Sequence, residues 1–544
     1  MHGLMMDDQL IITRMIEYAA RYHGSTEIVS RTVEGPMHRY TYADAYTRIQ
    51  KLGNALNTLG VELGDRVATF AWNGYRHLEL YFAISAVGAV CHAINPRLFP
   101  DQLDYIINHA EDRFIFLDIT FVPLLEAIKD KLPKVEGYIV MTDREHMPET
   151  SLPNVMCYED LLDAEPDTIE WPEFDERTAS SMCYTSGTTG NPKGALYSHR
   201  STVLHTMFIV SADVFSLSCK SVIMPATPMF HVYAWGTPYA AAMVGCKFVL
   251  PGPAYDGASI YELLETEKAT MAVGVPTVWM MLLDYVKKEG KSFPHLEATG
   301  IGGSAVPRSM IDTFEDDYDV RVFHAWGMTE MSPVGTTAQF NARTGTLPKE
   351  ERRQYQAKQG RTVCGVEMKI IDDDGNELPR DGTAFGEVAV RGPWVISAYY
   401  KDEEATRSQF TDDGWFLTGD VATLDAEGYM QIVDRSKDVI KSGGEWISSI
   451  DLENAAVGHP DVMEAAVIGM PHPKWDERPL LVIVKGEGAQ VSKDDMIGYL
   501  EDKVAKWWLP DDVAFVDELP HTATGKIAKR ILRDQFRDYT LPTV

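Results

Sequence analysis

The most informative run in this 544-residue chain is Tyr184-Thr185-Ser186-Gly187-Thr188-Thr189-Gly190-Asn191-Pro192-Lys193-Gly194. Its glycines can adopt positive φ and carry no Cβ, and its hydroxyl groups and lysine stand beside backbone N–H groups that a tight loop can turn inward. This combination is typical of a polyphosphate-binding loop. A Walker P-loop is excluded, because that loop needs a serine or threonine after its lysine and here Gly194 follows. By composition alone, an ordinary solvated loop is about equally compatible with the run.

Composition and charge describe a large, acidic, globular chain. At about 150 residues per domain, its length predicts three or four folding units. The 50 basic and 80 acidic residues give a formal net charge of −30, which argues against nucleic acid or an anionic membrane as a partner. The six cysteines lack the spacing of a zinc site or a disulfide framework, so we expect reduced thiols and a cytoplasmic location. We expect no signal peptide and no membrane span, since the longest apolar stretch, 82–94, is shorter than the roughly 20 residues that a span needs.

Apolar periodicity predicts alternating helices and strands through the first two thirds of the chain. The expected helices lie at 10–22, 76–87 and 101–109, and the expected strands at 66–71, 88–94, 114–117, 138–141, 221–224, 247–250 and 271–275. Strands joined by helices predict a doubly wound, parallel α/β sheet. From about 360 to 434, short runs broken by glycine and aspartate predict an antiparallel β subdomain. Beyond residue 435 we expect a small α+β module.

Four further motifs follow the loop. They are His-Ala-Trp-Gly-Met-Thr-Glu at 324–330, Gly-Trp-Phe-Leu-Thr-Gly-Asp at 414–420, Asp-Arg-Ser-Lys-Asp-Val-Ile-Lys-Ser-Gly-Gly-Glu at 434–445 and Thr-Gly-Lys at 524–526. Together with the loop, they resemble the adenylate-forming superfamily of acyl-CoA synthetases, adenylation domains and luciferases. The resemblance covers essentially the whole chain. It implies an N-terminal adenylation domain over residues 1–434 and a mobile C-terminal lid domain over 435–544, with the hinge at Lys437.

The resemblance also implies a nucleotide site. The run from Gly300 to Ala305 fits the Gly-x-Gly-x-x-Ala pattern, but a Rossmann site needs an acid at the end of the next strand, and Asp319 precedes that strand. In the family, this turn binds adenine instead. Asp420 matches an aspartate that accepts hydrogen bonds from both ribose hydroxyls. The residues expected to bind ATP and AMP are Thr185, Ser186, Gly187, Thr188, Thr189, Gly190, Lys193, Gly303, Ser304, Ala305, His324, Trp326, Gly327, Met328, Thr329, Asp420, Ile432, Arg435 and Lys526.

The implied first half-reaction is attack of a carboxylate on the α-phosphorus of ATP, which releases pyrophosphate and leaves an acyl-adenylate. Both reactants are anions, so positive charge placed where negative charge develops is the main requirement, and the ionised nucleophile needs no general base. The expected catalytic residues are Lys526, Glu330 and Thr185. Because Mg²⁺ binds through one or two carboxylates plus phosphate oxygens, Thr185 and Glu330 are also the expected metal ligands.

The second half-reaction distinguishes the branches of the family. The segment from Lys441 to Ile447 resembles the form found in CoA ligases, in which the glycine turn lines the pantetheine tunnel, so CoA is the expected acceptor. The expected CoA-binding residues are Lys441, Ser442, Gly443, Gly444, Glu445, Trp446 and Arg97. Two other readings stay open at this point. One is an enzyme that adenylates its substrate for oxidation or for loading a carrier protein, and the other is a binding protein that has kept the fold without catalysis.

The run Pro-Met-Phe-His-Val-Tyr-Ala-Trp-Gly at 228–236 resembles the acyl-pocket segment of the family, although it could also be a set of core aromatics on a helix. The expected pocket residues are His231, Val232, Trp235, Gly236, Gly302, Gly303, Trp326 and Pro333. Two indoles opposite a glycine turn leave room for a short chain, of about four to six heavy atoms. The segment 92–98 resembles bacterial medium-chain and 3-methylmercaptopropionate CoA ligases. We therefore expect 3-methylmercaptopropionate as the substrate, with medium-chain fatty acids as the alternative. The expected partners are ATP, CoA and the acid, and the sequence also allows a homodimer.

Overall fold

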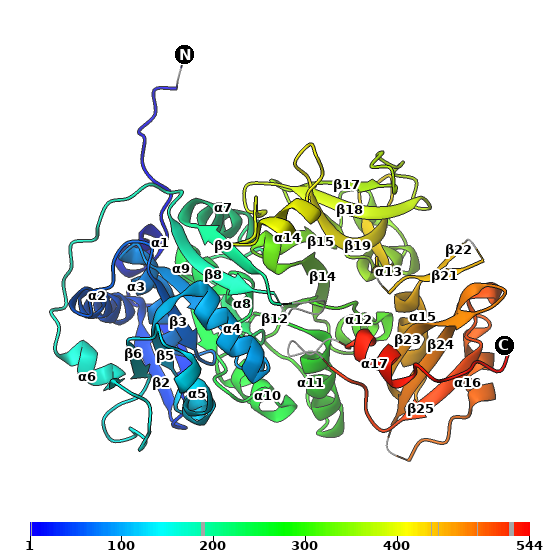
Figure 1. Ribbon diagram of the computed structural model, residues 1–544, viewed down its shortest axis with the longest axis horizontal. Coiled ribbons are helices and arrows are strands. Elements are labelled where there is room, and N and C mark those ends of the chain that lie inside the picture. Colours follow the sequence, from blue (N-terminus) through cyan, green and yellow to red (C-terminus); the bar gives the residue numbers. More distant parts are fainter. Residues whose placement is uncertain (2, 186–190, 437, 444, 487, 522–526) are drawn as a thin grey trace.

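The computed structural model describes residues 1–544 except 2, 186–190, 437, 444, 487 and 522–526. Lys437, Gly444, Lys526 and the centre of the phosphate loop, from Ser186 to Gly190, therefore lie outside the described residues. The described chain forms four sheets with helices packed around them, and the C-terminal sheet lies to one side of the other three (Figure 1). The predicted α/β class, with a large N-terminal part and a smaller α+β C-terminal part, is confirmed.

The first sheet has seven strands in the order β7-β6-β5-β3-β4-β8-β9. They are β3 (Arg66–Phe70), β4 (Val90–Ala93), β5 (Asp112–Leu117), β6 (Gly137–Val140), β7 (Val155–Cys157), β8 (Ala179–Tyr184) and β9 (Gly194–Ser198). All neighbours are parallel except β8 and β9, which form a hairpin. Because β8 ends at Tyr184 and β9 begins at Gly194, the ends of the phosphate loop are fixed at the carboxyl edge of the sheet.

The second sheet has nine strands in the order β16-β15-β14-β13-β12-β10-β11-β1-β2. They are β1 (Glu27–Arg31), β2 (Met37–Thr41), β10 (Val222–Pro225), β11 (Lys247–Leu250), β12 (Met271–Gly274), β13 (Ala298–Gly302), β14 (Arg321–Gly327), β15 (Val334–Thr337) and β16 (Arg361–Thr362). The run from β1 to β14 in this order is parallel. The carboxyl ends of β13 and β14 therefore lie side by side, which brings Gly302 beside Ala325 and Trp326. Ligand sites of open α/β sheets form at this edge.

Helices cover both large sheets. In the N-terminal part they are α1 (Thr13–Tyr22), α2 (Tyr42–Thr58), α3 (Tyr75–Ala86), α4 (Pro100–Ala110), α5 (Val122–Ile128), α6 (Tyr158–Asp163), α7 (His199–Ile209), α8 (Val232–Trp235), α9 (Thr237–Val244), α10 (Gly257–Thr266), α11 (Pro276–Lys288), α12 (Arg308–Asp312), α13 (Lys349–Ala357) and α14 (Glu403–Ser408). Every residue of α3 is buried, because this helix packs in the interior beside β4. Among the described residues, no helix is both long enough and apolar enough to cross a bilayer.

The last two sheets complete the chain. The antiparallel sheet contains β17 (Glu367–Ile371), β18 (Phe385–Arg391), β19 (Phe416–Leu424) and β20 (Met430–Arg435). The C-terminal sheet contains β21 (Ile440–Ser442), β22 (Glu445–Ile447), β23 (Val462–His472), β24 (Asp476–Lys485) and β25 (Asp512–Val516), with helices α15 (Ser449–Val457), α16 (Lys493–Leu500) and α17 (Lys529–Gln535). The change of sheet falls between β20 and β21, and the boundary at 434/435 stays a prediction.

Candidate functional site

The two ends of the phosphate loop are joined by their own hydrogen bonds. The Thr185 N–H donates to the Lys193 carbonyl oxygen at 2.9 Å, and the Lys193 N–H donates to Thr185 Oγ1 at 3.1 Å. The Lys193 ammonium lies 5.0 Å from the centre of the Tyr399 ring, in a cation–π contact. The hydrogen bonds between Thr185 and Lys193 thus hold the two ends of the loop together. The Lys193 side chain extends toward Tyr399, which lies between two strands of the antiparallel sheet.

Tyr399 connects this lysine to Glu330, because its ring contacts Lys193 and its hydroxyl contacts Glu330. Glu330 lies in a short 3₁₀ turn (Thr329–Met331) just after β14, and its carboxylate is buried. The Tyr399 hydroxyl donates to Glu330 Oε1 at 2.7 Å. Burial raises the pKa of Glu330, while the Tyr399 hydrogen bond and the charges of Arg435 and Lys193 oppose that rise. Lys193, Tyr399 and Glu330 therefore form one cluster, which joins the end of the phosphate loop to the predicted metal ligand Glu330.

A second cluster surrounds Asp420. Trp326 Nε1 donates to Asp420 Oδ2 at 2.9 Å, and Arg435 Nε pairs with Asp420 Oδ1 at 2.9 Å. Asp420 is buried on β19, whereas Arg435 is half exposed at the end of β20. His324, two residues before Trp326 on β14, is buried, and its Nδ1–H donates to the Ala357 carbonyl oxygen at 3.2 Å. Burial lowers the pKa of His324 to about 4. The predicted ribose acid and its arginine are thus brought together with Trp326.

The predicted acid pocket is also brought together, at the end of β13. A Cβ on Gly302 would lie only 2.6 Å from the Ala325 carbonyl oxygen, so the strand geometry here requires glycine, and the Trp235 indole lies beside it with Cη2 3.4 Å from that Cβ position. Gly303 has φ +83° and faces the same indole. The segment that carries Trp235 is not the ordinary right-handed helix of the alternative reading. Val232 to Trp235 all have positive φ and form a left-handed turn, which costs L-residues roughly 1–2 kcal/mol each.

His205 on α7 supports both sides of this pocket. The Val334 N–H donates to its Nε2 at 3.2 Å, and a Cβ on Gly236 would lie 3.0 Å from its Cε1. Burial lowers the pKa of His205 to about 3, so the ring is neutral and can accept this hydrogen bond. No motif surrounds His205 in the sequence, and an isolated histidine in a helix is usually a core residue, so sequence reasoning missed it.

The predicted CoA residues are divided between two regions. Lys441 and Ser442 lie on β21 of the C-terminal sheet, and the Gly443 N–H donates to the Trp475 carbonyl oxygen at 2.7 Å. Glu445 and Trp446 begin β22. Arg97 instead lies after β4 in the first sheet, where its guanidinium is 5.8 Å from the ring centres of Trp72 and Phe230. The described members of the predicted CoA set therefore belong to two different sheets, and Figure 1 shows the C-terminal sheet to one side of the others.

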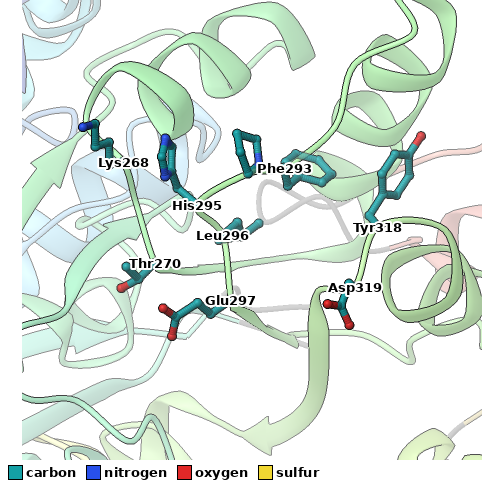
Figure 2. Close-up of a pocket in the computed structure, with 9 residues that line it drawn as sticks. Lys268, Thr270, Phe293, His295, Leu296, Glu297, Tyr318 and Asp319 are labelled. Carbon is teal, nitrogen blue, oxygen red and sulfur yellow. The ribbon is translucent and has the colours of Figure 1, made fainter.

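A pocket on the opposite edge of the second sheet is separate from this site. Figure 2 shows it at the amino ends of β12 and β13, where Thr270 and Glu297 precede the two strands. Its volume is about 450 Å³, and His295, Tyr318 and Asp319 also line it. Since Gly302 lies at the carboxyl end of β13, the length of the strand separates this pocket from the candidate site.

The site and the fold together define a class of protein: a multi-sheet α/β protein with a hydroxyl-rich loop and a buried glutamate at one sheet edge, and a separate α+β domain after it. Comparison with known proteins specifies the family. Residues 16–400 match the AMP-binding enzyme model, and residues 451–526 match the model of the AMP-binding enzyme C-terminal domain. This chain belongs to the AMP-binding enzyme family.

Individual relatives agree over the full length. The chain is 53% identical to a 3-methylmercaptopropionyl-CoA ligase of Ruegeria lacuscaerulensis, with 99% of each chain covered. It is 49% identical to a medium-chain-fatty-acid–CoA ligase of Ectopseudomonas oleovorans, with 99% of this chain and 98% of the relative covered. Among solved structures, the anthranilate CoA ligase AuaEII in complex with anthranoyl-AMP superposes with a TM-score of 0.85 at 25% identity, covering 96% of this chain and 97% of that one.

Proposed function

We propose that this chain is an ATP-dependent acid:CoA ligase. It converts a carboxylate and ATP into an acyl-adenylate and pyrophosphate, and then transfers the acyl group to the CoA thiol with release of AMP. The observation that carries the proposal is the cluster in which Lys193, Tyr399 and Glu330 join the phosphate loop to the carboxyl edge of the second sheet. The names of the full-length relatives support a CoA acceptor. Six unpaired cysteines support a cytoplasmic location.

Mg²⁺ is part of the proposal, with Glu330 and Thr185 as its protein ligands. No group of three or more His, Cys, Asp or Glu side chains among the described residues could hold a metal ion by itself. One carboxylate and one hydroxyl suit Mg²⁺, which keeps several waters and takes its remaining ligands from substrate phosphates. Bound there, the ion would neutralise charge on the triphosphate. Tyr399 holds the Glu330 carboxylate in place, and Lys193 adds a positive charge beside it.

Asp420 is the proposed ribose residue. Its carboxylate already accepts from Trp326 and Arg435, but a carboxylate has about four lone-pair sites, which leaves capacity for two ribose hydroxyls. Trp326 fixes the orientation of this acid, and Arg435 stands half exposed at the same place. The adenine then lies against the turn from Gly302 to Ala305, where the small residues leave room. Lys526 supplies a positive charge from the C-terminal domain during adenylation.

The proposed acid is 3-methylmercaptopropionate, with short to medium fatty acids as the alternative. Trp235 lies against Gly302 and closes the space beyond the glycine turn, which favours a short chain. A thioether sulfur gains roughly 0.3–1.5 kcal/mol from an aromatic contact, too little to exclude the all-carbon analogue. An enzyme that loads a carrier protein is the second candidate, and it differs only in the acceptor.

The test is a CoA-consumption screen with 3-methylmercaptopropionate, butyrate, hexanoate and dodecanoate, with pyrophosphate measured with and without CoA. We expect thioester formation with the first three acids and little with dodecanoate. Trp235→Ala should lose at least about tenfold in kcat/KM on the short acids through lost packing. Trp171→Ala, a partly buried indole beside Gly53, is the matched control. A wild type that prefers dodecanoate, or that forms adenylate but no thioester, would reject the proposal.

A further inference from the structure

One segment beside the acid pocket has a backbone that L-residues rarely adopt. Four consecutive residues without glycine, Val232 to Trp235, have φ between +44° and +60°, and Gly236 continues the turn at +78°. Left-handed backbone is normally visited by single residues, because Cβ approaches the following carbonyl oxygen. A run of this kind persists only where the surrounding structure holds it, and such runs concentrate at functional sites.

Tyr233 is the residue through which the turn is held. Its hydroxyl donates to the Cys91 carbonyl oxygen at 2.7 Å and accepts from the Met182 N–H at 2.9 Å, and the Met182 carbonyl oxygen also lies at 2.9 Å. The side chain is buried, and the rings of Tyr81 and Tyr197 meet it edge to face with centres 4.8 and 6.0 Å away. The Tyr233 hydroxyl therefore contacts one backbone N–H and two backbone carbonyl oxygens, all of which belong to strands of the first sheet.

These backbone partners belong to the strands that lead into the phosphate loop. Cys91 lies on β4, and Met182 lies on the neighbouring strand β8, three residues before Thr185. At the other end of the turn, Trp235 lies against Gly302. Reversing the sign of φ over this turn would point its side chains elsewhere, and the indole would leave Gly302. The turn thus connects the base of the phosphate loop with the wall of the acid pocket.

We propose that Tyr233 is a positioning residue whose hydroxyl holds the left-handed turn against β4 and β8, and that this contact sets the length of acid the pocket accepts. The proposal rests on the acid:CoA ligase function proposed above. Tyr233 acts through Trp235, so its loss changes how the acid fits and leaves the CoA site as it is.

Tyr239 provides a matched control in the same environment. It is buried, its ring centre lies 6.1 Å from that of Tyr233, and its hydroxyl has no hydrogen-bond partner within the described residues. Tyr239→Phe therefore removes the same oxygen atom from the same core without breaking a contact. Any effect seen in Tyr233→Phe and absent from Tyr239→Phe belongs to the contact with Cys91 and Met182.

The experiment compares the two variants in the full chain by hydrogen exchange and by kinetics. Tyr233→Phe should speed amide exchange in peptides covering 229–237 by at least about fivefold, while peptides from β24 stay unchanged. KM for hexanoate should rise by about tenfold while KM for dodecanoate falls or stays the same, and KM for CoA should remain within about twofold. Tyr239→Phe should match the wild type in all of these measurements.

Unchanged exchange at 229–237 in Tyr233→Phe would overturn the proposal. An equal loss with every acid would also overturn it, since a residue with only a general structural role would give that result. The exchange measurement does not depend on activity. A wild type without thioester formation would therefore reject the proposed function alone, and the comparison of exchange in the two variants would still decide whether Tyr233 holds the turn.

Discussion

Glu330 is a buried carboxylate whose ionisation depends on a few named neighbours. Burial raises its pKa above the ordinary value, and the hydrogen bond from Tyr399 together with the charges of Arg435 and Lys193 limits that rise. A metal ligand must be ionised, so these neighbours keep Glu330 ready for Mg²⁺. Tyr399 thereby has a role in the proposed mechanism that its own sequence surroundings do not indicate.

The Tyr399→Phe variant tests this role. A hydrogen bond to a charged group is worth about 1.5–3 kcal/mol, and its loss should raise the pKa of Glu330 further. When the pH is lowered, the variant should then lose the activity that needs the carboxylate at a higher pH than the wild type does. We expect about tenfold lower kcat/KM for MgATP at pH 6 and a smaller loss at pH 8. Tyr261→Phe, whose hydroxyl donates to the Ser292 carbonyl oxygen on the surface, should behave as the wild type.

Glu330→Gln completes this comparison because it removes the titrating group. That variant should need much more Mg²⁺ for the same rate and should lack the acid limb assigned to Glu330. If Tyr399→Phe and the wild type had identical pH profiles, the carboxylate would owe its ionisation to other groups.

Single functional residues were predictable where a motif surrounds them, and their partners were not. Glu330, Asp420 and Thr185 each stand in a recognisable run, and the structure brings the first two into buried clusters at one sheet edge. Tyr399 is 69 residues from Glu330 along the chain, so no local pattern joins them. Such pairs appear only when the strands are placed in space.

At the scale of elements, periodicity predicted the parallel strands β3, β4, β5, β6, β10, β11 and β12, and two of the features that it missed have a clear physical reason. β19 (Phe416–Leu424) contains Gly419 and has an irregular register with both of its neighbours, so its sequence lacks regular alternation. The other feature is the turn from Val232 to Gly236. The alternative reading of this segment, as a set of core aromatics, expected an ordinary helix there. Sequence periodicity assumes right-handed backbone, so it could not predict a left-handed turn.

One buried acid makes a prediction about the stability of the first sheet. Asp118 follows β5 and accepts from the Trp72 N–H at 2.7 Å, and burial raises its pKa to about 7. The folded state therefore keeps a proton that the unfolded chain releases above about pH 4. Because the folded state then binds more protons, the free energy of unfolding should fall as the pH rises from about 4 to 7, by roughly 2–3 kcal/mol between pH 5 and 8.

Asp118→Asn removes this titration and should flatten that part of the stability curve. Urea midpoints at pH 5 and pH 8 measure the effect, with Asp130→Asn, an exposed acid in the same region, as the control. Equal pH dependence in the wild type and Asp118→Asn would assign the slope to other groups.

At the scale of the whole molecule, the proposed mechanism needs the C-terminal domain to move. Ser448 Oγ donates to the Val433 carbonyl oxygen at 2.7 Å, and the Ser449 N–H donates to Asp434 Oδ2 at 3.1 Å, which ties the start of α15 to β20. Three residues after Lys526 in the sequence, Lys529 pairs with Glu453 at 2.8 Å. The charge of Lys529 is therefore neutralised inside the C-terminal domain, so Lys529 is not the proposed source of positive charge for adenylation.

The proposed hinge at Lys437 is tested by measuring the two half-reactions separately. Proline fixes φ near −65°, so Lys437→Pro restricts rotation of the C-terminal domain. We expect thioester formation from supplied acyl-adenylate to fall by at least about tenfold, with a smaller effect on adenylation. Lys437→Ala, which leaves φ free at the same position, is the matched control. Wild-type rates in both half-reactions of Lys437→Pro would place the hinge elsewhere.

The central claim is a two-step reaction through an acyl-adenylate, and a single-turnover experiment with the wild type tests it most directly. Excess enzyme is mixed with Mg²⁺, radiolabelled ATP and 3-methylmercaptopropionate, first without CoA and then with it, and quenched over time. We predict stoichiometric pyrophosphate and enzyme-bound acyl-adenylate before CoA is added, followed by acyl-CoA and AMP once it is present. Formation of ADP and phosphate, or pyrophosphate release only when CoA is already present, would contradict the account.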